Sequence, residues 1–200
     1  MRARLTRSER KAQTREALLD AGYAVFLRDG FHGASLDRVA AEAGFTKGAV
    51  YAHFTAKADL FLAILERRVD RRVLVQDTAG AEAGSYEELI GQAAEQWGAV
   101  MLEDRAWSLL LLEFWTYAAR DPELRERVAA QHRRTHDSIA GVLGAVRTRA
   151  ATTLAANDDA LATIIMALGN GLNIDGLLFS DAPRIDLYEL TLGALLEGLR

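Results

Sequence analysis

The 200-residue chain has no cysteine and only two prolines. Without cysteine it forms no disulfide, and thiolate catalysis, metal–thiolate sites and thiol redox switches are excluded. No run of about 18 apolar residues is present, and the basic N-terminus lacks the hydrophobic segment of a secretory signal. We therefore expect a cytoplasmic protein that does not insert into membranes. A chain of this length is able to bury a full core in one or two domains.

Charge is distributed unevenly along the chain. The formal net charge is -4, but residues 1–76 hold 14 Lys and Arg against 9 Asp and Glu, whereas residues 77–200 hold 10 against 19. The first part is thus basic and the second strongly acidic, which is compatible with nucleic-acid binding by the first part alone. Its N-terminus carries a basic cluster that either tracks phosphates as a flexible arm or serves only solubility: Arg2, Arg4, Arg7, Arg10 and Lys11.

Residues 35–60 have the pattern of two short helices joined by a tight turn. Ser35 is a typical N-cap, and the apolar residues that follow it recur at helical spacing up to Ala43. Gly44 is suited to the left-handed conformation that ends a helix, and Thr46 is suited to cap the next one. The segment therefore predicts a helix-turn-helix, a DNA-binding motif.

The second helix of this motif is expected to bury Ala49, Val50 and Phe54. Its other face would then meet DNA, with Thr46, Lys47 and Gly48 as candidates for reading bases in the major groove. Tyr51, His53 and Lys57 suit contacts with the phosphates on either side. The full set of predicted DNA-binding residues is Ser35, Phe45, Thr46, Lys47, Gly48, Tyr51, His53 and Lys57, with Arg7 and Lys11 from the N-terminal segment.

Residues 44–54, followed by Lys57, Asp59 and Leu60, resemble the signature of the tetracycline-repressor (TetR) family of regulators. The resemblance begins upstream with residues 15–21, Phe26 and Gly30, and covers about the first third of the chain. Phe45 departs from the smaller aliphatic residue usual in the family, so it either packs in the turn or reaches a thymine methyl group. The resemblance implies an all-α fold, a dimer on a palindromic double-stranded DNA operator and a small-molecule effector.

The rest of the chain also reads as helical, and no segment alternates convincingly as a strand. Asp121-Pro122-Glu123 is a typical helix start, with a capping acceptor, a proline in the first turn and an acidic residue. We expect an N-terminal three-helix DNA-binding domain at 1–56 and a helical effector-binding and dimerisation domain at 57–200. The expected helices are 8–29, 36–43, 47–54, 57–78, 86–103, 105–119, 122–149, 158–180 and 185–199.

The last two expected helices are apolar around most of their circumference. One face can pack within the chain, and the other predicts a two-fold dimer interface, unless both faces enter a monomer core. The predicted interface residues are Ile164, Leu168, Leu172, Leu187, Leu190 and Leu195. A dimer would place the DNA-contacting helices of its two subunits on half-sites about 34–36 Å apart.

All three tryptophans lie within a short stretch of the chain together with other large apolar residues. Such a group forms either a core or the wall of an effector pocket. The resemblance favours a pocket for a small hydrophobic or aromatic effector. Its predicted residues are Trp97, Met101, Trp107, Leu111, Phe114, Trp115, Tyr117, His136, Asn170 and Asn173.

Enzymatic and metal chemistry find little support in the sequence. His132 and His136 lie four residues apart, but there is no third ligand at a fixed offset, so no metal site and no cofactor are expected. No nucleophile elbow, phosphate loop or paired-carboxylate pattern is present. The resemblance to the TetR family therefore implies a ligand-responsive repressor, because repression is the usual activity of that family. The alternative is a helical small-molecule binder or enzyme with a vestigial DNA-binding motif.

Overall fold

The computed structural model describes residues 6–82, 85, 87–92, 94–95, 105–149, 156–179 and 185–198. Throughout these ranges every regular element is an α-helix, which confirms the predicted all-α fold. The helices are α1 (Arg7–Gly33), α2 (Leu36–Ala43), α3 (Lys47–Tyr51), α4 (Lys57–Glu82), α6 (Arg105–Ala118), α7 (Pro122–Arg149), α8 (Asp158–Phe179) and α9 (Ile185–Gly198). Of the expected helix 86–103, residues 87–92 and 94–95 are described, and they are helical.

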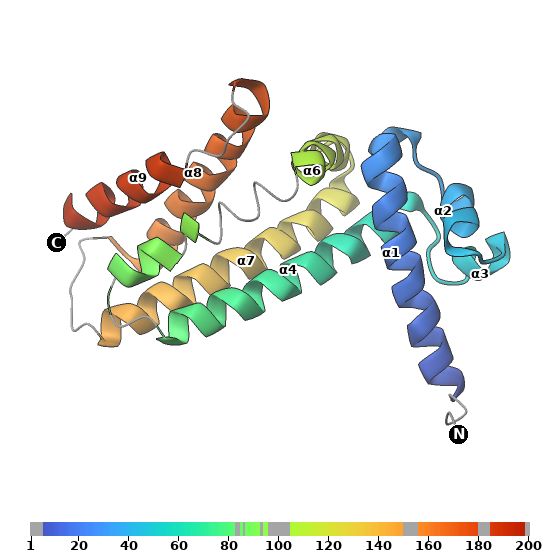
Figure 1. Ribbon diagram of the computed structural model, residues 1–200, viewed down its shortest axis with the longest axis horizontal. Helices are drawn as coiled ribbons and strands as arrows, with labels where there is room; N and C mark the ends of the chain where they lie inside the picture. Colours follow the sequence, from blue (N-terminus) through green and yellow to red (C-terminus); the bar gives the residue numbers. More distant parts are fainter. Residues whose placement is uncertain are drawn as a thin grey trace.

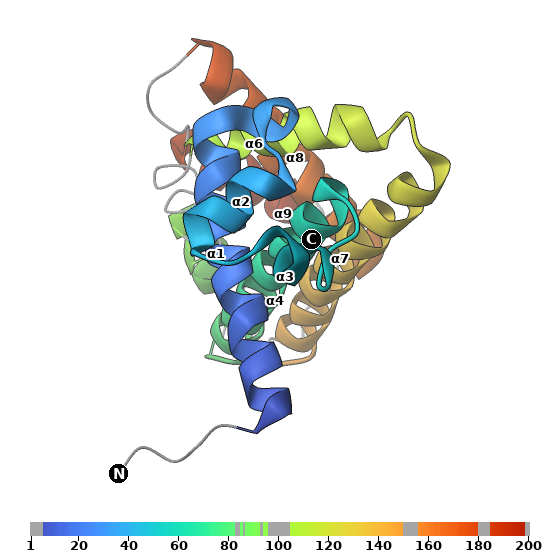
Figure 2. The same cartoon turned by 90° about the vertical axis from the view of Figure 1, so that its right-hand side faces the viewer.

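The helices form an elongated molecule with α1, α2 and α3 at one end (Figure 1). Helix α4 leaves this end and runs beside α7, its most extensive partner. Helices α8 and α9 lie towards the opposite end, and α6 packs against α1. Viewed along the long axis, α2 and α3 lie at the outer surface in front of the other helices (Figure 2). The motif at residues 35–60 therefore projects from one end of the molecule.

Local capping explains where the first helices begin and end. Thr6 and Glu9 form a capping box at the start of α1, and the Ser35 hydroxyl accepts the Arg38 backbone N–H at 3.3 Å at the start of α2. Gly44 ends α2 in the left-handed region at φ 69°, as its position predicts. The Thr46 hydroxyl then accepts the Ala49 N–H at 3.2 Å and caps α3.

Three of the expected helix ends differ from the observed ends by three or four residues, and one of them is the end of α4, which lies at Glu82 instead of residue 78. The first helix was expected to end near residue 29, but α1 continues to Gly33 across a non-helical break at Gly30, where φ is 70° and ψ is 171°. Glycine adopts such a backbone without the steric penalty that other residues meet, so the chain bends here and resumes. Helix α3 ends at Tyr51 instead of residue 54, and Ala52 and His53 follow it as a turn.

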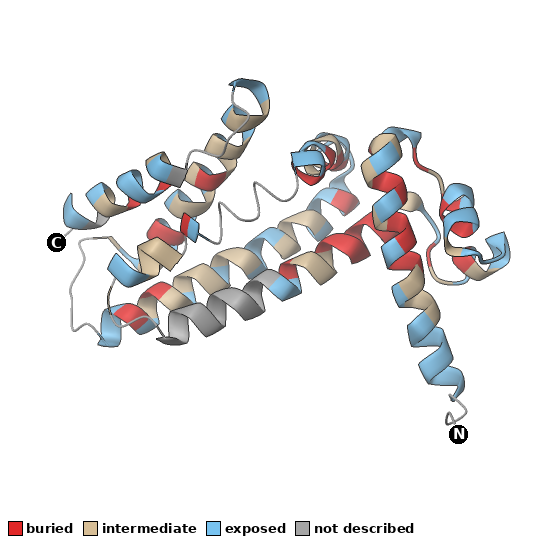
Figure 3. Ribbon diagram, in the orientation of Figure 1, coloured by how far each residue is buried: buried red, intermediate tan, exposed pale blue. Residues whose placement is uncertain are grey.

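The largest hydrophobic core connects the predicted DNA-binding domain to the helices beyond it (Figure 3). It contains buried residues of α1, α2 and α3, the first half of α4, much of α6 and Leu124 of α7. Two smaller clusters, centred on Leu161 and on Tyr188, hold α7, α8 and α9 together. Continuous packing therefore crosses the predicted boundary at residue 57, and the division into 1–56 and 57–200 stays a prediction.

Candidate DNA-binding site and its support

Helix α3 presents a polar, solvent-exposed face on an apolar base. Val50 and Phe54 are buried in the main core, and α3 packs chiefly on α2. Thr46, Lys47 and Gly48 are all exposed, and Tyr51 retains 52% of its exposed area. A helix that is anchored on one side and polar on the other is free to enter a DNA groove. Phe45, in the turn before α3, is 36% exposed.

Lys47 is held by a carboxylate of the preceding helix. Its ammonium lies 2.7 Å from the Asp37 carboxylate of α2, and this hydrogen bond raises the pKa of Lys47 above its ordinary value. Both side chains are largely exposed, so the pair contributes little to stability. The contact nevertheless places the ammonium beside the start of α3, where a base edge or phosphate is able to compete for it.

A second group of cations gathers where the chain leaves α3. His53 is half-buried, and burial lowers its pKa, with additional lowering by the positive charges of Lys11 and Arg15 on α1. The Arg15 guanidinium lies 5.6 Å from the centre of the Phe54 ring. The sequence had indicated His53 and Lys11, but Arg15 was not among the predicted site residues. Arg7 is exposed at the first residue of α1, and the remaining N-terminal arginines, Arg2 and Arg4, lie outside the described residues.

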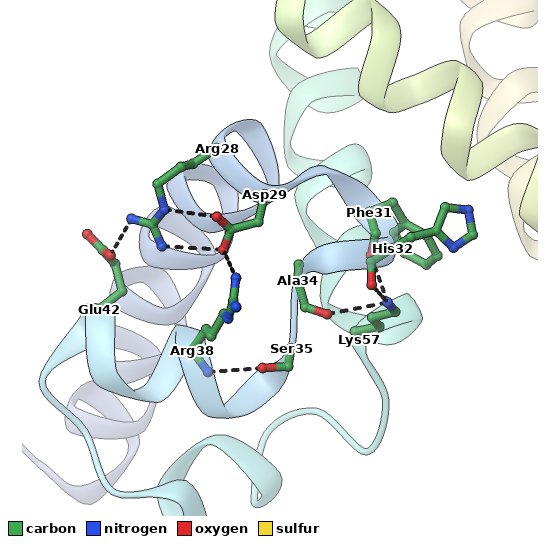
Figure 4. A network of polar contacts seen from close by, with 9 residues as sticks. All are labelled: Arg28, Asp29, Phe31, His32, Ala34, Ser35, Arg38, Glu42 and Lys57. Atoms are coloured by element: carbon green, nitrogen blue, oxygen red, sulfur yellow. Dashed lines mark hydrogen bonds and ion pairs between the residues drawn. The ribbon is translucent and has the colours of Figure 1, made fainter.

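The sequence predicted that Lys57 contacts a phosphate, but the structure bonds this side chain to the protein backbone. Its ammonium donates to three backbone carbonyls, those of Phe31 at 2.7 Å, His32 at 2.9 Å and Ala34 at 3.3 Å (Figure 4). An ammonium has three N–H donors, so these bonds account for all of them. Partial burial lowers the pKa of Lys57. The side chain therefore caps the last turn of α1, and the sequence could not indicate this because the acceptors lie 23 to 26 residues away.

Helix α2 is fixed on α1 by an ion network at its outer side (Figure 4). The Asp29 carboxylate accepts from the guanidinium groups of Arg28 at 3.1 Å and Arg38 at 2.9 Å, and Arg28 also reaches Glu42 at 3.0 Å. The hydrogen bonds with Arg28 and then Arg38 lower the pKa of Asp29. These contacts orient α2, and with it α3, relative to α1.

Several residues predicted to line an effector pocket lie in the main core instead. Trp107 is 2% exposed, and its ring stacks on Phe61 of α4 at a centroid distance of 5.4 Å. Phe114 is fully buried against Phe61 and Phe31. Periodicity alone could not separate core from pocket, because both place large apolar side chains on the inner face of a helix. These two aromatics fasten α6 to the DNA-binding end.

The other predicted pocket residues are spread over three helices. Leu111 and Trp115 pack on the edge of the main core, and Tyr117 is 40% exposed beside Phe31. His136 bonds to the backbone oxygen of Asp159 at 3.1 Å, and hydrogen bonds, first that with Asp137, raise its pKa. Asn170 and Asn173 are half-buried on α8, and Trp97 and Met101 lie outside the described residues. Over the described ranges no cluster of three His, Asp or Glu side chains suitable for a metal ion occurs.

The predicted dimer residues divide into two groups. Ile164 and Leu190 are exposed, at 41% and 67%, and Leu187 is half-buried. Leu168, Leu172 and Leu195 instead pack on the small core clusters of the same chain, so the structure gives them an intramolecular role. The contacts of α8 with α7 and α9 decide which side of α8 is covered, and the sequence does not specify them.

Helix α8 exposes further apolar residues that the predicted interface omitted. We define the α8 stripe as the exposed residues on one face of this helix, spaced three, four or seven apart: Ile164, Ala167, Gly171, Ile174 and Leu178. Phe179, at the end of the helix, is 79% exposed. By length and composition α8 is also able to cross a membrane, and 17% of its most apolar window is buried within the chain.

Comparison with known proteins matches both parts of the chain to regulators. Residues 18–64 match the model described as bacterial regulatory proteins, tetR family, and residues 87–200 match the model for the C-terminal part of BetI-type transcriptional repressors. The transcriptional activator FasR of Mycolicibacterium smegmatis is 44% identical over 70 residues, which are 35% of this chain and 30% of that protein. The regulator TtgW of Pseudomonas putida is 44% identical over 66 residues, or 33% of this chain and 48% of that protein.

The matched segments therefore span less than half the length of these two relatives. A solved structure extends the similarity over nearly the whole chain. It is a TetR-family member of Streptomyces coelicolor A3, with 27% identity, a TM-score of 0.69 and coverage of 92% of this chain and 98% of that one.

Proposed function

The chain belongs to the tetR family of bacterial regulatory proteins, and from this premise we propose that it is a dimeric, DNA-binding transcriptional repressor released by a small-molecule effector. The observation that carries the proposal is the exposed polar face of α3 on its buried base of Val50 and Phe54. In this proposal Lys47 and Gly48 contact base edges, and Lys11 and Arg15, the cations near His53, contact phosphates. Repression is proposed because the second matched model is that of a repressor.

The α8 stripe supports a dimer through α8 and α9. It is apolar apart from Asp175, which is exposed four residues after Gly171, and it extends along more than three turns and is backed by helices of its own chain. A second copy would cover it by two-fold symmetry, since a self-complementary patch needs only one surface type. Paired subunits would then present two α3 helices to a palindromic operator.

The proposed effector is a hydrophobic or aromatic small molecule bound among the C-terminal helices. Support comes from half-buried side chains on α6, α7 and α8, one of them aromatic and three of them polar: Trp115, His136, Asn170 and Asn173. Such a mixture is usual in ligand sites. A compound that binds the folded protein would raise its melting temperature and weaken its binding to operator.

DNA binding is tested by fluorescence anisotropy on duplexes from the region upstream of the chain's own gene, with a random duplex as reference. We expect the purified protein to bind one upstream site more tightly than random DNA, with affinities that fall steeply as salt rises. Lys47→Ala should weaken operator binding about 10- to 100-fold and random DNA much less, because it removes a base contact. Arg125→Ala, which removes an exposed cation of α7, is the control and should change neither affinity.

Equal losses on operator and random DNA for Lys47→Ala would remove Lys47 from base reading. The proposed repressor function would be refuted if the wild-type protein bound no upstream DNA at low salt and catalysed the conversion of a small molecule. That outcome would favour a helical enzyme or binder with a vestigial motif.

DNA binding should also depend on pH through His53. In the free protein burial, Lys11 and Arg15 keep its pKa below the ordinary value, and a neighbouring phosphate would raise it. Binding then takes up a proton, so operator affinity should increase as pH falls through the range between the two pKa values. Each unit of pKa difference contributes a factor of about ten. Anisotropy titrations across this pH range measure the slope.

His53→Gln retains a polar side chain but cannot become charged, and it should flatten this slope. His132→Gln, at an exposed position of α7 far along the chain from the motif, should leave the slope unchanged. If His53→Gln and the wild type show the same pH dependence, His53 does not contact phosphate.

A further inference from the structure

Besides its aromatic packing, α6 is connected to the DNA-binding end by a hydrogen bond to the broken end of α1. We define the α1–α2 corner as residues 30–35, between the break at Gly30 and the cap of α2 at Ser35. The break removes the Phe31 N–H from the helical path, and the Glu113 carboxylate of α6 accepts it at 2.9 Å. A Cβ atom added at Gly30 would lie 3.1 Å from the same carboxylate, so Glu113 sits directly over the break.

The backbone of Phe31 is therefore held by hydrogen bonds at both its N–H and its C=O. Its N–H bonds to Glu113 of α6, and its C=O bonds to Lys57 of α4 at 2.7 Å. The ring of Phe31 is fully buried and makes aromatic contacts with Phe114 at 5.1 Å and Tyr117 at 4.9 Å, both on α6. The corner thus cannot rotate relative to α6 without losing the carboxylate contact and this packing.

The N-terminal end of α6 is attached to α8. The Arg105 guanidinium donates to the backbone oxygens of Gly176 at 3.3 Å and Leu177 at 2.8 Å, in the last turn of α8. These residues adjoin Leu178 of the α8 stripe. Arg105 and Glu113 are eight residues apart, or about 12 Å along the helix axis. Helix α6 therefore links the end of the proposed dimer helix directly to the α1–α2 corner.

We propose that Glu113 is a positioning residue through which α6 sets the orientation of α2 and α3. It acts through the Phe31 peptide and does not touch DNA. Since α2 begins at the corner and α3 follows after one turn, a fixed corner fixes the direction in which α3 points. The inference rests on the proposed DNA-binding function, because orientation matters only when two α3 helices must match two half-sites.

The test compares Glu113→Ala and Glu113→Gln for binding to the wild-type chain's best upstream duplex and to random DNA. Glu113→Ala should lower the affinity for the operator about tenfold and the affinity for random DNA less than twofold. Random DNA has no paired half-sites that the two α3 helices must match. Glu113→Gln retains an oxygen acceptor and should recover to within about threefold of wild type. Thr116→Ala, one turn further along α6 at an exposed position, is the control and should bind like wild type.

Operator binding of Glu113→Ala within twofold of wild type would overturn the proposal, as would equal losses on both duplexes. A Gln variant as weak as the Ala variant would also overturn it. Melting temperatures and sedimentation of each variant confirm that folding and assembly are retained.

A second measurement separates this inference from the proposed function. Hydrogen exchange of the Phe31 amide reports its bond to Glu113 whether or not the chain binds DNA. Glu113→Ala should speed this exchange at least tenfold while the amides of Val25 and Val50, in the surrounding core, stay slow. If the wild type does not bind operator but the Phe31 amide exchanges fast in Glu113→Ala, the proposed function is refuted and the hydrogen bond between Glu113 and Phe31 is supported. Unchanged exchange would refute the corner contact itself.

Arg105→Ala tests whether the link extends to α8. If both residues act through α6, the operator loss in the Arg105→Ala, Glu113→Ala double variant should be no larger than the greater single loss. Fully additive losses would show that the two contacts act independently. The link would then connect α6 to α1 and would not include α8.

Discussion

Phe31→Ala should destabilise the protein by about 3–5 kcal/mol, the largest effect that we expect from a single truncation. The ring is fully buried and contacts Phe26, Phe61, Phe114 and Tyr117, so alanine leaves a cavity among residues of three helices. Aromatic pairs of this geometry contribute beyond the buried area. The loss should also loosen α6 from the DNA-binding end, because Phe114 and Tyr117 belong to α6. Urea denaturation at one fixed protein concentration measures the change.

Phe45→Ala is the matched control for this truncation. Phe45 lies in the turn before α3 and is 36% exposed, so its removal should cost only about 1–2 kcal/mol. A Phe31→Ala variant as stable as Phe45→Ala would mean that the aromatic cluster joining α1, α4 and α6 does not support the fold.

Leu178→Glu should convert a dimer into a monomer and lower operator affinity about 100-fold or more. Leu178 is 68% exposed in the single chain, so the substitution leaves the protomer's own core intact. In a dimer through the α8 stripe, it would bury a carboxylate against an apolar partner surface, which is costly without a paired cation. Loss of the second subunit removes the gain from simultaneous binding to two half-sites, which is commonly a factor of 10² to 10⁴. Sedimentation velocity and anisotropy measure the two effects.

Leu109→Glu provides the same chemical change at another exposed leucine. Leu109 lies on α6 outside the α8 stripe and is 48% exposed. This variant should remain dimeric and bind operator like the wild type. If Leu178→Glu also remained dimeric at micromolar concentration, the α8 stripe would not be the dimer interface.

The element bounds that the sequence predicted well are those with strong local signals. Ser35, Gly44, Thr46 and Pro122 each act on the backbone within a few residues. The two ends of α2 and the starts of α3 and α7 lie where these residues predict them. The family resemblance had a similar local basis, because its residues lie close together within the first third of the chain. The end of α1 was missed because Gly30 is stabilised in its unusual conformation by Glu113, which lies 83 positions further along.

Residue roles were harder to predict than residue locations. Lys57 was expected at DNA because it is a cation next to the recognition helix, yet its ammonium is occupied by carbonyls at the end of α1. Trp107 and Phe114 were expected around a ligand and instead fasten α6 to α1 and α4. In each case the side chain has a partner that is distant in sequence, and periodicity contains no information about such partners.

The sequence by itself determined the helical fold, the helix-turn-helix and the basic character of the end that carries it. These properties follow from capping, from apolar spacing and from charge counts, which act over one or two helical turns. Tertiary structure alone decided which face of α8 is left uncovered and how α6 reaches the α1–α2 corner. Both depend on how helices pack across long sequence separations, where the free energy of a contact is set by its surroundings and not by the residue's neighbours in the chain.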